Sequence, residues 1–308
     1  MSRRDLLAAS AAGILLPSLA LAAPNPKRKR SLRIAHLTDI HVQPENGAPK
    51  GMEAAIEHAQ GQKDKPGLLF TGGDLIMDCF NQDLARSKAQ WDVFTSVLKA
   101  NIEIPVAHTI GNHDVWGWGN PDAYSKDPKY GKAWACEILE MPKPYRSFDR
   151  AGWHFITLDS TFQVGKGYTA KLDEEQFEWL KDDLAKNSKK PTMVVSHIPI
   201  VSVCSMFDGD NAKTGNWVIP GSWLHIDAKR IKDLFAKYPN VKLCLSGHEH
   251  LTDQVSVGGV TYCCNGAVSG GWWGGDYYDC TYGYGLVDLY DDGSFENRYV
   301  PYGWKTTK

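Results

Sequence analysis

The sequence predicts an α/β fold in which short, buried strands alternate with amphipathic helices and a β-rich segment ends the chain. Six short apolar runs, helical patterns between them, and paired turn signals near the end support this prediction. Short runs rich in Ile, Val and Leu are typical of strands covered on both faces. The chain has 308 residues, of which 43% are hydrophobic and 23% charged. That composition is typical of a globular protein with a substantial core.

The predicted strands end in polar residues. Five of the six apolar runs lead directly into clusters that contain Asp, Asn or His. Because α/β folds place their sites at the carboxyl ends of the strands, we expect these clusters to meet at one edge. The predicted strands cover residues 32–37, 68–71, 104–110, 153–158, 193–195 and 241–245.

Three helices and two hairpins complete the expected elements. The spacing of apolar residues predicts helices at residues 83–99, 173–185 and 227–237. Gly-Gly and Asp-Gly pairs, at residues 258–259 and 292–293, indicate tight turns between alternating strands. Nothing in the composition marks a boundary, so we expect a single domain over residues 31–308.

Residues 1–22 have the features of a secretory signal peptide. An apolar run follows Arg3 and Arg4 and ends in small residues suited to cleavage. Residues 2–7 also resemble a twin-arginine export signal, with ordinary secretion or an uncleaved anchor as the alternatives. We interpret residues 23–30 as a basic linker. We therefore expect an exported protein, periplasmic or secreted, without a stable membrane anchor after cleavage.

Seven donor side chains stand in the polar clusters. Carboxylate, amide and imidazole donors without a thiolate suit Mn, Fe, Zn or Co. Asp39 and His41 are two residues apart at a strand end, so both can face the same way, as can His248 and His250. Asp74 has two oxygens and could hold two cations at the separation of about 3.5–4 Å that two-metal hydrolysis requires. Any one of these residues alone would indicate little, but the ordered set predicts a metal site. The candidate ligands are Asp39, His41, Asp74, Asn112, His197, His248 and His250.

The clusters also match a known pattern. They read Asp39-Ile40-His41, Gly73-Asp74, Gly111-Asn112-His113-Asp114, His197 and Gly247-His248-Glu249-His250. This set, spread over residues 32–251, resembles the five motifs of the calcineurin-like metallophosphoesterases. The resemblance implies a sandwich of two stacked mixed β-sheets flanked by helices, with the site at one edge. It also implies two metal ions, one held by Asp39, His41, Asp74 and His250, and the other by Asp74, Asn112, His197 and His248.

Within that family, the spacing is most similar to the bacterial branch of cyclic-nucleotide and glycerophosphodiester phosphodiesterases. That branch often has a second Asp three residues after the bridging Asp, whereas Asp78 stands one position later here. Purple acid phosphatases have an iron-binding Tyr at the position that Met77 occupies in this chain. The purple acid subfamily is therefore disfavoured.

The resemblance implies hydrolysis of phosphate esters, most of all small phosphodiesters. Hydroxide formed from a metal-bound water would attack phosphorus in line with the leaving oxygen. His113, oriented by Asp114, would protonate the departing alkoxide. The alternatives are a phosphomonoesterase or protein phosphatase with the same site, or a non-catalytic binding module. A net charge of −2 argues against nucleic acid as a partner. The oligomeric state is not predicted.

Two Gly-rich aromatic segments flank the motifs, at residues 115–120 and 270–275. Their tryptophans could form a wall for the non-phosphate part of a diester, where stacking on a base contributes about 1–3 kcal/mol. The alternative is that they pack the loops onto the sheet edge. The histidine of the Trp-Leu-His sequence at residues 223–225 is a further candidate. The candidate substrate contacts are Trp116, Trp272, Trp273 and His225.

Replacing Arg3 and Arg4 by Lys should block export if the signal is of the twin-arginine type, because that route reads the arginine pair. Immunoblots of periplasmic and cytoplasmic fractions check this. As a control, Leu15→Arg with Leu16→Arg interrupts the apolar run and should block either route. Normal export of the double-Lys variant would instead assign the ordinary secretory route.

Overall fold

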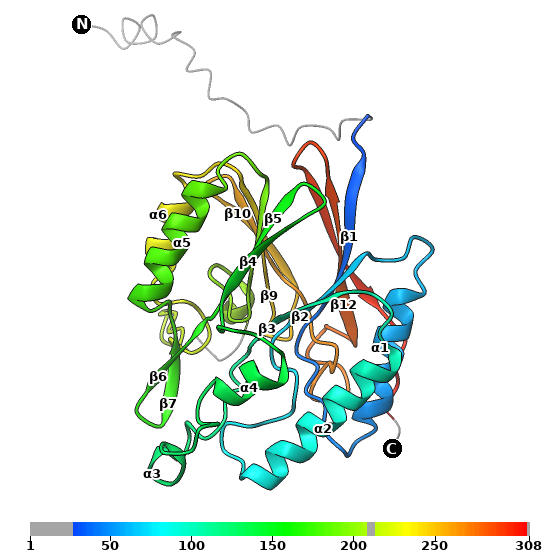
Figure 1. The fold of residues 1–308 in the computed structure, drawn as a ribbon, viewed down its shortest axis with the longest axis vertical. Helices are drawn as coiled ribbons and strands as arrows, with labels where there is room; N and C mark the ends of the chain where they lie inside the picture. The colour runs from blue at the N-terminus through cyan, green and yellow to red at the C-terminus, as the bar shows by residue number, and fades with distance from the viewer. Residues whose placement is uncertain (1–26, 208–212, 307–308) are drawn as a thin grey trace, which may run out of the picture.

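A computed structural model describes residues 27–207 and 213–306 and shows two stacked β-sheets with helices outside them (Figure 1). The first sheet has the strand order β13-β12-β1-β2-β3. In it β1, β2 and β3 are parallel, and β12 and β13 join through antiparallel pairings. Its strands are β1 (Arg30–Leu37), β2 (Leu68–Gly72), β3 (Val106–Thr109), β12 (Gly283–Tyr290) and β13 (Phe295–Pro301).

The second sheet has the strand order β10-β11-β9-β8-β5-β4. Its central strands are parallel, and β4 and β10 pair antiparallel at the two edges. A separate hairpin consists of β6 (Thr161–Val164) and β7 (Gly167–Ala170). The six strands are β4 (Arg146–Arg150), β5 (Trp153–Leu158), β8 (Thr192–Ser196), β9 (Val241–Ser246), β10 (Asp253–Val257) and β11 (Val260–Cys264).

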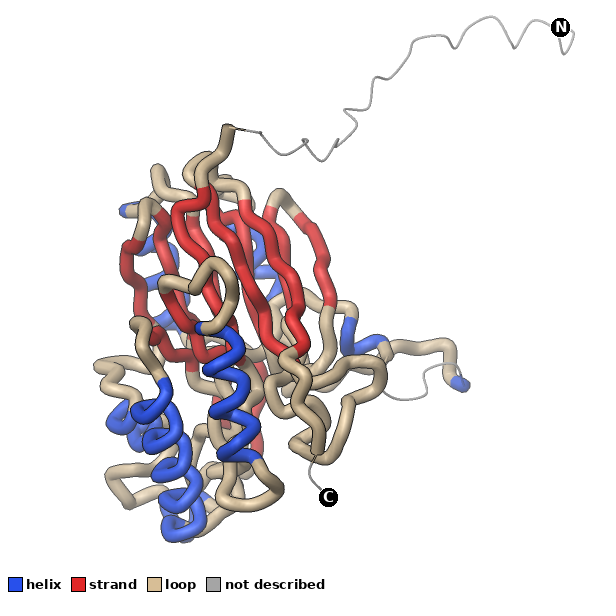
Figure 2. Tube along the Cα trace, turned by 90° about the vertical axis from the view of Figure 1, so that its right-hand side faces the viewer, coloured by secondary structure: helices blue, strands red, loops and turns tan. Residues whose placement is uncertain are grey.

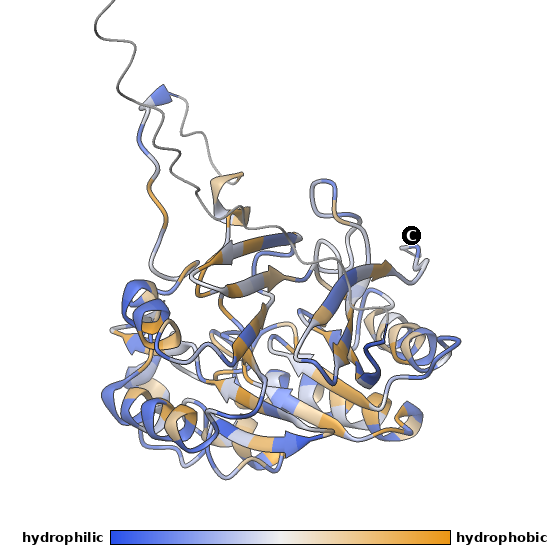
Figure 3. Ribbon diagram, turned by 90° about the horizontal axis from the view of Figure 1, so that it is seen from above, coloured by the Kyte–Doolittle hydropathy of each residue, from blue (hydrophilic) through white to orange (hydrophobic). Residues whose placement is uncertain are grey.

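Helices cover the outer faces of both sheets (Figure 3). Apolar residues of α1 and α2 pack on the first sheet, and those of α5 and α6 pack on the second. The predicted sandwich of two mixed sheets flanked by helices is therefore confirmed. The helices are α1 (Ala48–Gln60), α2 (Leu84–Asn101), α3 (Pro121–Tyr124), α4 (Ala133–Ile138), α5 (Glu174–Lys186), α6 (Ala228–Phe235) and the short 3₁₀ helix η1 (Cys204–Met206).

The core between the sheets follows from the alternation of side chains along the strands. Ile34 of β1 and Phe155 of β5 face this core, whereas the next residue of each strand faces the helices. Trp153 connects the sheets directly, because its Nε1 donates to the carbonyl of Tyr290 at 2.9 Å. This packing fixes the ends of the strands, where long loops gather (Figure 2).

The six predicted strands and three predicted helices are confirmed, with ends within two residues of those expected. Both predicted hairpins are present as well. Asp83 precedes α2 and Asp173 precedes α5 as N-cap residues, and their side chains accept the backbone N–H groups three residues on. Such caps stabilise helix starts.

Helix α1 was not predicted, and its sequence explains why. It contains Gly51, a poor helix former, in its second turn. A Cβ at Gly51 would lie 2.0 Å from a ring atom of Trp273, far inside van der Waals contact. The glycine is therefore required by a tertiary contact that the local pattern does not contain.

The signal peptide predicted for residues 1–22 lies outside the described residues. Part of the expected basic linker is corrected, because β1 already begins at Arg30. Arg28 is also held, since its guanidinium lies 3.7 Å from the centre of the Tyr290 ring and donates to Ser294 Oγ at 3.1 Å. Within the described ranges, no helix combines the length and apolar character that crossing a membrane requires.

Candidate metal centre

The polar clusters meet at the carboxyl ends of β1, β2, β3, β8 and β9, which belong to both sheets. The strand order brings these ends to one edge of the sandwich, as predicted. Three groups of side chains each offer donor atoms within 4.8 Å of one another: Asp39, His41 and His250; His41, Asp74 and His113; and Asp74, His197 and His248.

The backbone at most of the candidate ligands is left-handed. We expected Asp39 and His41 to converge by strand alternation, but both lie beyond the end of β1. Non-glycine residues are uncommon in this region of φ, and each costs about 1–3 kcal/mol. Strain of this kind persists where the surrounding structure imposes it, most often at functional sites. The φ angles are 54° at Asp39, 45° at His41, 50° at Asp74, 72° at His248 and 56° at His250.

Two glycines allow the clusters to approach one another. A Cβ at Gly111 would lie 2.2 Å from Asp74 Oδ1, and one at Gly247 would lie 2.1 Å from Asp39 Oδ2. A larger residue at either position would displace a carboxylate of the site. The absence of a side chain, rather than a special turn, makes these glycines part of the centre.

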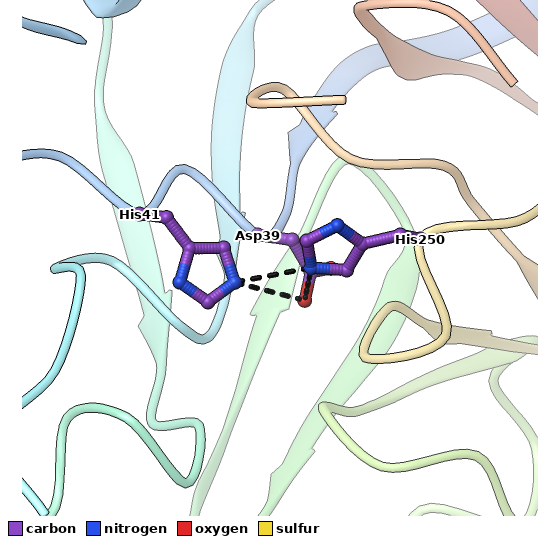
Figure 4. A group of neighbouring side chains, drawn as sticks. All are labelled: Asp39, His41 and His250. Atoms are coloured by element: carbon purple, nitrogen blue, oxygen red, sulfur yellow. Dashed lines mark hydrogen bonds and ion pairs between the residues drawn. The ribbon is translucent and has the colours of Figure 1, made fainter. Parts of the chain in front are cut away.

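Asp39, His41 and His250 form the first donor group, and all three are buried (Figure 4). The Nε2 atoms of the two histidines are 3.1 Å apart. Asp39 Oδ1 lies 3.5 Å from His250 Nε2 and 4.0 Å from His41 Nε2. Donors that share one cation at about 2.1 Å lie about 3–4 Å apart. The spacing therefore fits a cation among these three side chains.

Asp74, Asn112, His197 and His248 form the second donor group. His197 Nε2 lies 3.1 Å from Asp74 Oδ2, and the rings of His197 and His248 are 5.2 Å apart at their centres. Asn112 Oδ1 is buried and has no hydrogen-bond partner in the described part of the chain. Leaving such an oxygen unpaired costs about 1–3 kcal/mol, and a bound cation would satisfy it.

Asp74 is part of the second group and also approaches His41 of the first. Its Oδ2 atom lies 3.8 Å from His41 Nε2 as well as 3.1 Å from His197 Nε2. Its Oδ1 atom accepts the backbone N–H of His113 at 2.8 Å. One oxygen thus faces the donors while the other anchors the carboxylate to the loop after β3.

Backbone carbonyls orient two of the imidazoles. Gly72 O lies 2.8 Å from His197 Nδ1, and Gly270 O lies 2.6 Å from His250 Nδ1. A carbonyl only accepts, so Nδ1 carries the proton in each ring. When the ring is neutral, Nε2 then presents a lone pair to the donor group, as a metal ligand requires.

Burial and neighbouring charges set the protonation of the site. Burial lowers the pKa of His248 to about 3 and the pKa of His41 well below its ordinary value. Burial also lowers the pKa of His197, but attraction to Asp74 and Asp39 outweighs it and brings the value to about 9. Burial raises the pKa of Asp39, against the attraction of nearby histidines. A cation would displace the proton of His197 and offset the charge of both carboxylates.

His113 lies beside the donor groups, and 31% of its side chain is exposed. Its Nδ1 donates to the carbonyl of Met77 at 2.7 Å, so its Nε2 is the nitrogen left for a ligand. Asp78 Oδ1 lies 3.9 Å from the same Nδ1. Besides Asp74, with which it shares a donor group, His113 therefore has the carboxylate of Asp78 nearby, to which its sequence position alone gave no role.

The expectation that Asp114 orients His113 is wrong. Asp114 is buried, and its two oxygens accept the backbone N–H groups of Leu75 and Gly111, each at 2.8 Å. These bonds tie the loop after β2 to the loop after β3. Asp114 therefore supports the backbone on either side of the site rather than the imidazole.

Three of the four expected substrate contacts are buried and structural, and Trp116 and His225 are the first two of them. Trp116 is buried, with its ring centre 4.7 Å from Tyr124 and 5.7 Å from Trp134. His225 is buried and holds Ser196 through Nε2 at 3.2 Å and Asp227 through Nδ1 at 2.9 Å. Neither side chain has a polar atom left to offer a substrate, so both expectations are corrected.

The adjacent residues Trp272 and Trp273 have opposite environments. Trp273 is buried, and its Nε1 donates to the carbonyls of Ile40 at 3.1 Å and His41 at 3.0 Å. It supports the loop that carries two ligands, so its expected substrate contact is corrected. Trp272 is 37% exposed, and its ring centre lies 4.3 Å from that of His250. Of the three expected tryptophans, it is the one that lines the site.

Three aromatic side chains at the site were not predicted. Tyr168 of β7, Trp223 and Tyr277 line the pocket of about 200 Å³ that contains the donor groups. They come from a hairpin and two loops that are far apart in the sequence. They were not predicted because an aromatic residue in a loop usually indicates packing rather than a site. Only the tertiary structure brings them to the donors.

A two-sheet sandwich with carboxylate and imidazole donors gathered at its strand ends defines the class of metal-dependent phosphoesterases. The model of the calcineurin-like phosphoesterase family matches residues 32–251, and the chain belongs to this family. The resemblance drawn from the five motifs is thereby confirmed.

Similar proteins include several bacterial enzymes. The chain is 25% identical over 228 residues to the 3′,5′-cyclic adenosine monophosphate phosphodiesterase CpdA of Escherichia coli (strain K12), covering 71% of this chain and 70% of that protein. It is 31% identical over 234 residues to a 3′,5′-cyclic-nucleotide phosphodiesterase of Nostoc, covering 72% of this chain and 73% of that one.

Solved structures share the fold. A dimetal phosphatase from Danio rerio superposes with a TM-score of 0.60 at 13% identity and covers 89% of this chain and 100% of that one. GAP50 of Plasmodium, described as the anchor in the inner membrane complex, superposes with a TM-score of 0.55 at 16% identity, covering 88% and 85%. At these identities the likeness concerns the fold alone.

Replacing Asp74 by Asn should strongly reduce bound metal, because the change removes the one carboxylate that touches both donor groups. The amide keeps the acceptor for the His113 backbone, so the fold should persist. Metal content after dialysis, measured by plasma mass spectrometry, checks this. Asp159→Asn, a buried carboxylate paired with Lys132 outside the groups, is the control and should retain wild-type metal. Wild-type metal content in Asp74→Asn would contradict the assignment.

Proposed function

We propose that the protein is a metal-dependent phosphodiesterase that hydrolyses small phosphodiesters, with cyclic nucleotides as the leading class. The observation that carries the proposal is the pair of donor groups joined at Asp74, with His113 at their edge. Two similar proteins act, by their names, on cyclic nucleotides.

Each donor group would hold one cation, which makes the proposed centre binuclear. Mn, Fe, Zn and Co all suit such oxygen and nitrogen donors. When bound, the cations lower the pKa of water and offset charge on the phosphoryl oxygens. One cation would be held by Asp39, His41, Asp74 and His250, and the other by Asp74, Asn112, His197 and His248.

His113 is the proposed general acid. Because Met77 holds its Nδ1, its Nε2 can carry the proton that the departing alkoxide takes up when the ester bond breaks. Asp78 Oδ1 lies 3.9 Å from the same Nδ1, on the side of the ring that faces away from the departing alkoxide in this proposal. In this proposal Asp78 has the supporting role that the sequence suggested for Asp114.

The charge of the surroundings favours diesters over monoesters. A phosphomonoester carries up to two negative charges near neutral pH, whereas a diester carries one. Among the described residues that line the metal pocket and the space beside His113, none is Lys or Arg. A site for monoester dianions or phosphoproteins would gain from such a cation. A phosphomonoesterase or protein phosphatase is therefore the weaker alternative.

A non-catalytic binding module is weaker still, because such a module has no need to keep the seven donors together. Export also remains a proposal that rests on residues 1–22, with the test given above.

A substrate screen tests the function. With Mn²⁺, Fe²⁺, Zn²⁺ or Co²⁺, purified protein should hydrolyse bis-p-nitrophenyl phosphate and 3′,5′-cyclic nucleotides faster than p-nitrophenyl phosphate. Rates of nitrophenolate release and chromatography of nucleotides measure this. The Asp74→Asn variant is the control for contaminating enzymes. Faster hydrolysis of the monoester with every metal would overturn the diester preference, and no hydrolysis at all would favour the binding module.

Replacing His113 by Ala should leave the metals bound but slow hydrolysis of a cyclic nucleotide by about 10²–10⁴-fold, the usual effect of a positioned acid. The loss should be much smaller for a nitrophenyl diester, whose leaving group needs no proton. Steady-state kcat values for both substrates check this. An equal loss for both would mean that His113 binds phosphate instead of donating a proton.

A further inference from the structure

The metal pocket continues into a larger chamber on the side of His113. The chamber has a volume of about 760 Å³, within the range of about 300–1,000 Å³ typical of small-molecule sites. Asn112, His113, Tyr168 and Trp272 line both spaces, so the two form one recess. His113 therefore stands where a bound phosphate would meet the organic part of its ester.

The walls of the chamber are aromatic. The ring of Trp272 is tilted by 31° against His250 on the side of the metal pocket, and its exposed surface faces the recess. Tyr168 of the β6–β7 hairpin stands on a neighbouring wall and packs against Phe80 with ring centres 5.7 Å apart. Burial raises the pKa of Tyr168, so its hydroxyl remains a neutral hydrogen-bond donor.

The backbone of Trp272 has a strained, left-handed conformation. Its φ of 52° lies in the left-handed region, which a tryptophan rarely adopts. The next residue, Trp273, is anchored to the ligand loop by the hydrogen bonds of its Nε1. Because Trp273 is anchored in this way, the side chain of Trp272 points outward. The loop that supports the metal ligands therefore also places a flat aromatic face at the chamber.

The polar residues of the chamber suit a neutral group with both donors and acceptors. Asn81 is exposed at the chamber, and its side chain makes no hydrogen bond within the part of the chain that the structure describes. Its Oδ1 lies beside Gly119, where a Cβ would be 2.0 Å from it. An amide offers one donor group and one acceptor, the combination that pairs with the edge of a nucleobase.

Electrostatics excludes a second anionic group. Asp78 is the carboxylate at the chamber, and no Lys or Arg is among the described residues that line it. A cationic head group could be attracted by Trp272. However, both oxygens of Asp78 already accept hydrogen bonds, from the Phe80 backbone at 2.8 Å and from Gln82 Nε2 at 3.2 Å. The flat ring of Trp272 and the amide of Asn81 therefore favour a nucleobase over a compact cation.

We infer that this chamber binds the nucleoside part of the substrate, with the base stacked on Trp272 and its edge beside Asn81. The inference rests on the proposed function and deepens it, because it names the part of the ligand that gives specificity. In the hydrolysis itself, water adds a hydroxyl to phosphorus, the ester P–O bond breaks, and the departing oxygen takes a proton. The nucleoside stays in the chamber throughout.

Equilibrium binding to the Mn²⁺-loaded protein tests the inference without turnover. Calorimetry gives Kd for adenosine 5′-phosphate, ribose 5-phosphate, phosphocholine and inorganic phosphate. Because the first two differ by the base alone, the ratio of their Kd values measures the contribution of the base. Stacking predicts that adenosine 5′-phosphate binds about 5- to 150-fold more tightly than ribose 5-phosphate.

The variants assign that contribution to residues. Trp272→Leu should bring the ratio close to one. Because both ligands of the ratio carry the same phosphate, a change in phosphate binding caused by the contact of Trp272 with His250 cancels in it. Asn81→Ala, at an exposed position that leaves the fold intact, should lower the ratio by about 2- to 10-fold. Trp217→Leu is the matched control, because Trp217 is 57% exposed and does not line the chamber. It should leave the ratio unchanged.

Three results would overturn the inference: a ratio near one in the wild type, a ratio that neither Trp272→Leu nor Asn81→Ala changes, or tighter binding of phosphocholine than of adenosine 5′-phosphate. Failure of the proposed function is distinguishable from these. A base-dependent ratio without hydrolysis of any diester would reject the proposed phosphodiesterase function but support nucleoside binding in the chamber. Hydrolysis of cyclic nucleotides with a Kd ratio near one would support the proposed phosphodiesterase function but reject nucleoside binding in the chamber.

Discussion

The crowding of two buried carboxylates, Asp39 and Asp74, among histidines is the constraint on which the rest of the structure depends. Burial raises the pKa of Asp39, and repulsion from Asp74 adds to this effect, whereas at Asp74 burial is outweighed by attraction to His197 and other histidines, which lowers its pKa. Hydrogen bonds to the two carboxylates offset only part of the cost of burying their charges. The backbone N–H of His248 and the hydroxyl of Thr38 donate to Asp39, and the backbone N–H of His113 donates to Asp74. The remaining negative charge, with imidazole lone pairs turned toward it, is an environment suited to cations.

Holding these groups together requires a rigid frame. The parallel strands of both sheets end on the same side, so five loops converge at one edge. The core between the sheets fixes the strand ends, and left-handed backbone at five ligands turns the side chains inward. At about 1–3 kcal/mol each, these conformations are a sizeable fraction of the stability of a typical domain. The large apolar core offsets that cost.

The recess has two ends of different chemistry. The deep end holds the carboxylates and imidazoles, beside aromatic rings, and suits cations and a phosphoryl group. The outer end has aromatic rings and amides, and the described residues that line it include no Lys or Arg. Trp272 joins the ends, because one part of its ring lies against His250 and another against the chamber. The two donor groups lie at the deep end. We therefore assign hydrolysis to the deep end and recognition of the nucleoside to the outer end.

The sequence by itself determined the elements of the sandwich, the seven donors and the family, because apolar runs and the polar clusters after them are local patterns. Gly111 and Gly247 were also visible as parts of the motifs, although the steric reason for them was not. The tertiary structure decided which partner each side chain has. His113 contacts Met77 and lies near Asp78 instead of Asp114, since the loops after β2 and β3 turn Asp114 toward backbone N–H groups. Trp272 and Trp273 are equivalent in the sequence, yet one is exposed and the other buried, because the loop that carries them folds back over the ligands. Local sequence specifies which atoms can bind or donate, but distances between loops from different strands exist only once the two sheets have packed.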